Sequence, residues 1–146
     1  MDDVVTVIRR FTVGRPADAV LDYLADFGNT PEWDPGTLRC TRLDDGPVRA
    51  GSRWLNTSRF RGRTTELTYR LDRFEPGRLL FVGENRTVTA TDDIALFARD
   101  GRTEVVYEAR LRFKGPARLV APFMRAEFER LADGVERRLP EVLGAG

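Results

Sequence analysis

The C-terminal stretch RLVAPFMRAEFERLADGVERRL, from Arg118 to Leu139, decides the fold of this 146-residue chain. Its apolar residues recur every three or four positions, whereas most of its charged residues fall elsewhere on a helical wheel. That spacing predicts a long helix with one apolar face. Pro122 removes an internal hydrogen bond, so we expect a kink or a restart there, and Pro140 and Gly144 mark the expected end. At about 1.5 Å per residue, such a helix is long enough to cross a whole sheet.

Upstream of this helix, the sequence alternates between strand-like segments and turns. Runs rich in β-branched and aromatic residues are separated by turn signals such as Asp100-Gly101. Consecutive short turns favour antiparallel neighbours over crossover connections. The expected strands are residues 37–43, 53–60, 64–74, 78–82, 87–98 and 103–113.

The N-terminal region adds one strand and a short helix. Alternating apolar residues over Val4–Val13 predict a strand, although Arg9 interrupts its apolar face. Residues 17–27 have helical spacing, and Pro16 suits the first turn of that helix. The turn-rich segment Thr30–Gly36 has room for at most one short helical turn.

This order of elements predicts an α+β protein. The economical packing curls an antiparallel sheet around the apolar stripe of the final helix. We therefore expect one domain over residues 1–146, with a curved antiparallel sheet of about seven strands wrapped around the long C-terminal helix. One or two short helices are expected after the first strand.

Local motifs strengthen this prediction. The segment Phe11–Val20 runs from a strand through Pro16 into a helix, and Trp33-Asp34-Pro35 forms a Trp-x-Pro turn. With residues 72–79 and 101–105, these segments resemble the START-like, polyketide cyclase/dehydrase superfamily (SRPBCC proteins) along the whole chain. The resemblance implies a helix-grip fold with a cavity, open at one end, between the sheet and the long helix. It also implies binding of lipids, sterols, polyketides or other apolar molecules, whereas a minority of members catalyse cyclisation or dehydration.

Composition restricts the possible chemistry. The chain has no histidine, and Cys40 is its only cysteine. These absences exclude Ser-His and Cys-His nucleophile pairs and histidine-containing or multi-cysteine metal sites. We therefore predict no metal, no cofactor and no assigned catalytic residue.

Charge and hydropathy restrict the possible partners. The net charge of +1 gives no overall attraction to nucleic acid, and no apolar run approaches the roughly 18 residues of a membrane span. Arg59, Arg61 and Arg63 are interpreted as a solvated outer strand face. Because the Met1-Asp2-Asp3 start is acidic, unlike a secretory signal, we predict a cytoplasmic protein.

Strand alternation and helical spacing identify residues that would face a cavity. Most of the apolar candidates are expected to be ordinary core, and Trp33 lies either at the cavity mouth or in a structural plug. Polar residues on apolar faces are more informative, because small-molecule sites combine apolar walls with a few polar groups. The candidate ligand-binding residues are Trp33, Trp54, Asn56, Ser58, Phe60, Leu67, Tyr69, Leu71, Val105, Tyr107, Ala109, Phe123, Met124, Glu127 and Leu131.

Three functional hypotheses follow from the sequence. The first is binding of a small hydrophobic or amphipathic molecule, lipid-like or polyketide-like. The second is an aromatase/cyclase in which Glu127, Tyr69 or Tyr107 serves as acid or base, because no histidine is present. The third is a protein-interaction module, with a homodimer through the sheet edge or the long helix. If Glu127 points away from the cavity, the second hypothesis loses its best acid.

Overall fold

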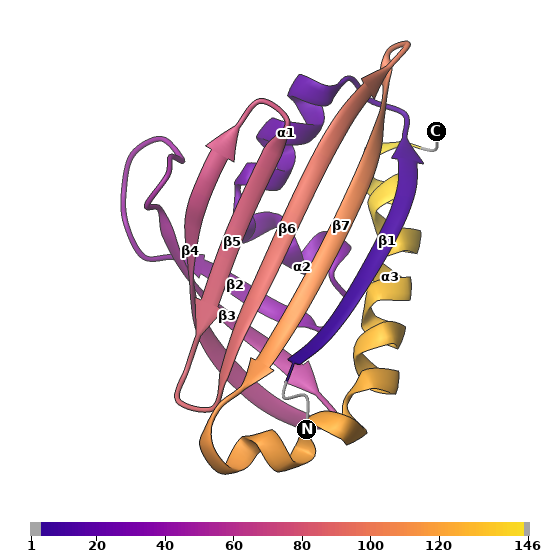
Figure 1. Cartoon of the computed structure of the whole chain (residues 1–146). Helices are drawn as coiled ribbons and strands as arrows, with labels where there is room; N and C mark the ends of the chain where they lie inside the picture. Colours follow the sequence, from indigo (N-terminus) through magenta and orange to yellow (C-terminus); the bar gives the residue numbers. More distant parts are fainter. Residues whose placement is uncertain (1–3, 145–146) are drawn as a thin grey trace.

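A computed structural model of the chain describes residues 4–144 (Figure 1). The helices lie in two groups, one after the first strand and one after the last. The helical elements are α1 (Ala17–Ala25), the 3-10 helix η1 (Phe27–Asn29), α2 (Thr30–Trp33), the 3-10 helix η2 (Gly115–Phe123) and α3 (Arg125–Leu143). The strands are β1 (Val4–Val13), β2 (Thr37–Arg42), β3 (Arg53–Phe60), β4 (Arg63–Glu75), β5 (Arg78–Glu84), β6 (Val88–Arg99) and β7 (Arg102–Phe113).

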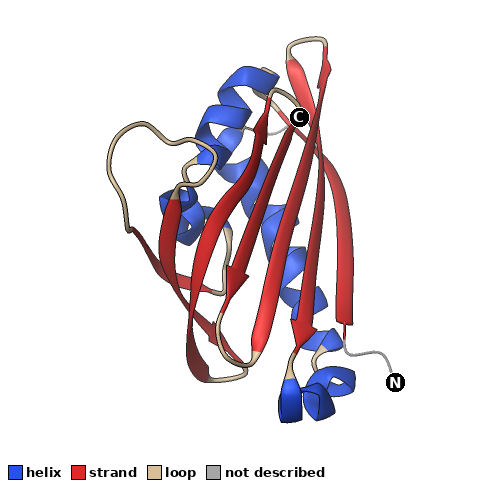
Figure 2. Ribbon diagram, turned by 60° about the vertical axis from the view of Figure 1, so that its left-hand side comes forward, coloured by secondary structure: helices blue, strands red, loops and turns tan. Residues whose placement is uncertain are grey.

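The seven strands form one sheet in the order β1-β7-β6-β5-β4-β3-β2. Every neighbouring pair is antiparallel, as the short connections predicted. The sheet curves around α3, and α1 and α2 cover the remainder of the concave face (Figures 1 and 2). The predicted α+β class and helix-grip arrangement are confirmed.

Burial along β6 shows how the sequence sets the inner face of the sheet. Val88, Ala90, Ile94 and Leu96 are buried, whereas the residues between them are more exposed. This alternation is the period of two that a half-buried strand requires. Asp92 belongs to the same buried series, so a carboxyl group points to the concave side of the sheet.

The C-terminal region is divided differently from the sequence prediction. Residues 115–123, which include Pro122, form η2, and the α-helix begins only at Arg125. Pro122 explains the break, because a proline cannot donate an internal backbone hydrogen bond. At the other end, α3 continues through Pro140 to Leu143, and Gly144 follows with a φ of 98°.

Two contacts fix α3 over the sheet. On one side, Arg9 of β1 forms an ion pair of 2.8 Å with Asp133, which explains why a charged residue interrupts the apolar face of that strand. On the other side, a Cβ added to Gly134 would lie 2.5 Å from Cγ of Pro35, so the helix backbone lies directly on the segment after α2. This close approach brings Asp34 next to the helix. Within residues 4–144, no helix has the length and hydropathy needed to cross a membrane.

Candidate functional site: a carboxylate-bearing cavity

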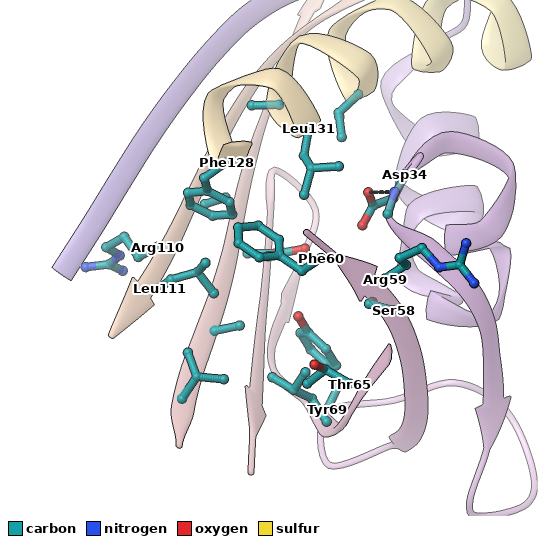
Figure 3. A pocket seen from close by; sticks show the side chains of 18 of the residues that line it. Asp34, Ser58, Arg59, Phe60, Thr65, Tyr69, Arg110, Leu111, Phe128 and Leu131 are labelled. Carbon is teal, nitrogen blue, oxygen red and sulfur yellow. Dashed lines mark hydrogen bonds between the residues drawn. The ribbon is translucent and has the colours of Figure 1, made fainter. Parts of the chain in front are cut away.

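A cavity of about 200 Å³ lies between the concave face of the sheet and the first turns of α3 (Figure 3). Strands β3, β4, β6 and β7 contribute inward-facing side chains, and the loop after α2 contributes Asp34 and Gly36. The helix contributes one face, with the spacing that α-helical geometry requires: Phe128, Leu131, Ala132 and Val135. An engineered apolar cavity of about 150 Å³ holds benzene, so this space fits one ring and a short substituent.

Three small side chains leave space among the larger residues that line the cavity. Ala90 and Ala109 face it from neighbouring strands, and Ala132 faces it from α3. At the other end of the sheet, Phe27 stacks on Phe81 with ring centroids 4.3 Å apart. The rings there pack against one another in an aromatic cluster that consists of Phe27, Trp33, Trp54, Tyr69 and Phe81.

The side chains that line the cavity are more buried at one end than at the other. Asp92 and Tyr107 are buried at the deep end, whereas Phe60 is half-buried and Thr87 is exposed. The open end therefore lies near the β3–β4 turn and the start of β6. There the Arg61 guanidinium donates a hydrogen bond of 2.8 Å to the carbonyl of Phe123, which connects the β3–β4 turn to η2.

Asp92 is the least expected group in the cavity. It is 7% exposed, and its hydrogen-bond partner among the described residues is the Tyr107 hydroxyl at a long 3.5 Å. Burial and the nearby Asp34 carboxylate raise the pKa of Asp92 to about 7, and the Tyr107 hydrogen bond only partly offsets them. Asp92 therefore exchanges its proton near neutral pH.

Asp34 has a different environment, because several donors point at its carboxylate. The Gly36 amide donates to Oδ1 at 3.0 Å, and the Thr37 hydroxyl donates to Oδ2 at 3.0 Å. Burial raises the pKa of Asp34 above its usual value, and these hydrogen bonds and the positive charge of Arg138 only partly offset that increase. Of the two carboxyl groups, Asp34 is the one that accepts more hydrogen bonds from its surroundings.

A chain of hydrogen bonds extends behind Asp34. The Asn56 amide donates to the Thr37 hydroxyl, and the Ser58 hydroxyl donates to the Asn56 carbonyl oxygen. Strands β2 and β3 thus orient Thr37 toward Asp34. Asn56 acts through Thr37 and is not among the residues that line the cavity.

Tyr69 lies at the boundary between the aromatic cluster and the cavity. Its ring lies against Gly83 of the neighbouring strand, where a Cβ would come within 2.6 Å of ring atoms. The side chain is 8% exposed and lines the cavity, yet its hydroxyl has no hydrogen-bond partner among the described residues. Burial, followed by the Asp92 charge, raises the pKa of Tyr69, so this hydroxyl stays protonated and available as a donor.

The structure brings seven of the sequence candidates to the cavity wall, and their side chains come from three strands and α3. They are Ser58, Phe60, Leu67, Tyr69, Tyr107, Ala109 and Leu131. Four other candidates lie in the packed core away from the cavity, with less than 1% of their surface exposed: Trp33, Trp54, Leu71 and Val105. Trp33 contacts Phe27 and Tyr107 edge-on, which agrees with the structural role considered for it.

The three candidates around the start of α3 are not among the residues that line the cavity. Phe123 is 70% exposed because the break at Pro122 turns it outward at the end of η2. Met124 precedes α3 and packs against the edge of the core. Glu127 forms an ion pair of 2.8 Å with Arg130. The face of α3 that lines the cavity is the adjacent one, which begins at Phe128.

The two cavity carboxylates were missed by the sequence analysis. Asp92 could have been found, because in the expected strand 87–98 a period of two places it on the same face as the apolar Ile94 and Leu96. Asp34 gave no comparable signal, since it lies in a turn and reaches the cavity only through the packing of α3. A cluster of three or more potential metal-ligating side chains does not occur within residues 4–144.

Comparison with known families explains the fold. A sequence model described as "Polyketide cyclase / dehydrase and lipid transport" matches residues 4–142. The chain belongs to this family. A search of curated proteins finds no match to the sequence.

Solved structures with this fold have diverged widely in sequence. A START superfamily protein from Mycobacterium smegmatis superposes with a TM-score of 0.78 at 13% identity, over 94% of this chain and 96% of that one. The Zhui aromatase/cyclase from Streptomyces sp. R1128 gives 0.73 at 18% identity, over 96% and 91%. The major latex-like protein 151 of Panax ginseng gives 0.71 at 9% identity, over 97% and 99%. At such low identities the likeness establishes the fold, and function has to be argued from the site.

Proposed function

We propose that this family member binds a small apolar or amphipathic molecule in the cavity between the sheet and α3. The observation that carries the proposal is a cavity of about 200 Å³ with mainly apolar walls and a few inward polar groups. Burial of the ligand surface would supply most of the affinity, at about 25 cal/mol per Å² of apolar area. The volume fits a compact ligand, and a multi-ring polyketide would require the open end to widen.

The first experiment is native mass spectrometry of gently purified protein, followed by saturation-transfer NMR with toluene and naphthalene as neutral probes. We expect either a bound mass of small-molecule size or a saturation transfer to the probes. Ala109→Leu, which fills the cavity, should abolish the transfer. Ala95→Leu, a matched change on the outward-facing side of β6, should preserve it. A protein that carries no bound mass and ignores both probes would contradict the proposal.

Acid–base catalysis is a second candidate, and Asp92 is the observation that favours it. With a pKa of about 7, this carboxyl is present in both protonation states near neutral pH, as a proton-transfer catalyst requires. Asp92 with Tyr107 thus takes the place considered for Glu127 in the sequence analysis. Such a site could remove a proton next to a carbonyl and return it to a leaving hydroxyl, releasing water.

Mass spectrometry of a small β-hydroxy ketone incubated with the protein tests this second candidate. Loss of one water should depend on Asp92 and should disappear in Asp92→Asn. Asp93→Asn is the matched control, because Asp93 lies on the outer face and pairs with Arg78. Equal rates in both variants would exclude Asp92 from any catalytic role.

A further inference from the structure

The charges around the cavity are distributed unevenly. Asp34 and Asp92 line it, and the pKa of Asp92 responds to the Asp34 charge. Two arginines also border the cavity, but their side chains lead away from it (Figure 3). Arg59 is exposed, and Arg110 is exposed and paired with Glu108 at 3.3 Å.

No cation of the described chain forms an ion pair with Asp92. The groups that face its carboxyl are Asp34 from the loop after α2, Tyr107 from β7 and Tyr69 from β4. From α3, the side chains at the cavity are apolar, and Arg138 acts on Asp34. Buried carboxylates are normally paired with a cation or kept neutral, so Asp92 lacks the partner that its ionised form requires.

A ligand can provide that partner. An ammonium group near Asp92 would be attracted by both carboxylates in a medium of low dielectric constant, where charge interactions are strong. The rings of Tyr69 and Tyr107 would add a favourable contact with the cation. A ligand carboxylate would meet the opposite situation, because it would approach two like charges without a compensating cation.

We propose that the cavity selects compact, apolar primary amines, with the ammonium group against Asp92 and the ring against the walls formed by Ala90, Ala109 and Leu131. This inference rests on the proposed binding function and names its ligand class. Tyr69, whose hydroxyl has no hydrogen-bond partner among residues 4–144, is the other polar group directed at the bound molecule.

The test compares three probes of nearly equal shape by calorimetry: phenethylamine, phenethyl alcohol and hydrocinnamate. Near pH 8 we expect the amine to bind at least about tenfold more tightly than the alcohol, and the carboxylate not to bind. The affinity for the amine should rise by up to about tenfold per pH unit between about pH 5 and 7 and then level off, because Asp92 must ionise. The affinity for the alcohol should not rise in this range.

Two variants locate the effect. Asp92→Asn should abolish the preference for the amine over the alcohol, whereas Asp93→Asn should retain it. If Asp92→Asn fails to fold, the pH profile of the unmodified protein decides the question. An alcohol that binds as tightly as the amine, or an amine affinity that does not change with pH, overturns the inference and leaves the binding function intact. If toluene and naphthalene also fail to bind, the proposed function itself is overturned.

Discussion

Near α1, the concave face of the sheet is filled by aromatic rings, whereas near η2 the same face surrounds a cavity. The two regions share strands, alternation and coverage by helices. They differ in side-chain volume: Trp54 and Phe81 point inward in the first region, and Ala90 and Ala109 point inward in the second. The difference between a filled and a hollow region of the same sheet therefore depends on a few side chains.

The two regions also differ in polarity. In the aromatic region, Phe27 stacks on Phe81 and is tilted against Tyr69, and the buried indole nitrogens of Trp33 and Trp54 have no hydrogen-bond partner among the described residues. In the cavity region, buried polar groups have few partners, and Asp92 is the clearest case. A buried carboxyl without an ionic partner destabilises a fold far more than an unpaired indole N–H does, so Asp92 is consistent with a site used by a ligand.

The largest expected loss of stability comes from removing a ring from the aromatic cluster. Trp54 is fully buried, so Trp54→Ala should lower the free energy of unfolding by roughly 3–5 kcal/mol. Phe97→Ala is the matched aromatic change on the outer face, where the ring is 50% exposed, and should cost less than about 1 kcal/mol. Urea unfolding followed by circular dichroism measures both. Similar losses in the two variants would contradict the assignment of inner and outer faces.

Asp92→Asn should stabilise the protein in a pH-dependent way. The pKa of Asp92 is about 7 in the folded protein, above the value of about 3.9 in an unfolded chain. The folded state therefore loses stability as the pH rises from about 4 to 7, because ionising Asp92 costs free energy in the folded protein but not in the unfolded chain. The variant avoids this loss and should be more stable than the unmodified protein near pH 8, by roughly 2–4 kcal/mol, with no such gain near pH 4.

Asp93→Asn is the control for that measurement. Asp93 forms an ion pair of 2.7 Å with Arg78, whose side chain is 45% exposed, so its removal should cost only about 0–1 kcal/mol. The neighbouring aspartates should thus respond with opposite signs above neutral pH. A loss of stability in Asp92→Asn near pH 8 would show that the cavity carboxyl is better compensated than its contacts indicate.

Adding one methyl group at the boundary between the aromatic cluster and the cavity should lower the stability of the protein. A Cβ at position 83 would lie 2.6 Å from the Tyr69 ring, so Gly83→Ala should destabilise the protein by about 1–3 kcal/mol. Gly77→Ala is the control, because the contact there is an ordinary 3.4 Å. Chemical denaturation of the two variants gives the comparison, and equal stabilities would mean that Tyr69 moves aside easily.

The smallest effect is expected from filling the cavity. Ala90→Leu adds more volume than Gly83→Ala, but it adds it where space exists, so the free energy of unfolding should change by less than about 1 kcal/mol. Thermal unfolding with a probe titration would separate stability from binding. A large destabilisation would indicate that the walls around Ala90 leave no usable space.

The sequence predicts the fold well because the face to which a strand side chain points, and the order of the helices and strands, depend on residues close together in the chain. Alternation identified the inner faces of the strands, and turn residues such as Gly101 marked the hairpins. The cavity is not local, since its volume depends on which small residues of β6, β7 and α3 meet. Asp34 illustrates the limit: its position depends on the contact between Pro35 and Gly134, a hundred residues later in the chain.

The hydrogen bond from Arg61 to the Phe123 carbonyl has a kinetic consequence. Both residues are exposed, so breaking this bond costs only about 0.5–1.5 kcal/mol and the contact opens readily. The contact between Arg61 and Phe123 would therefore not retain a molecule in the cavity. The residence time of that molecule would depend on the contacts at the deep end, and a change at Arg61 would leave both the exchange rates and the equilibrium constant nearly unchanged.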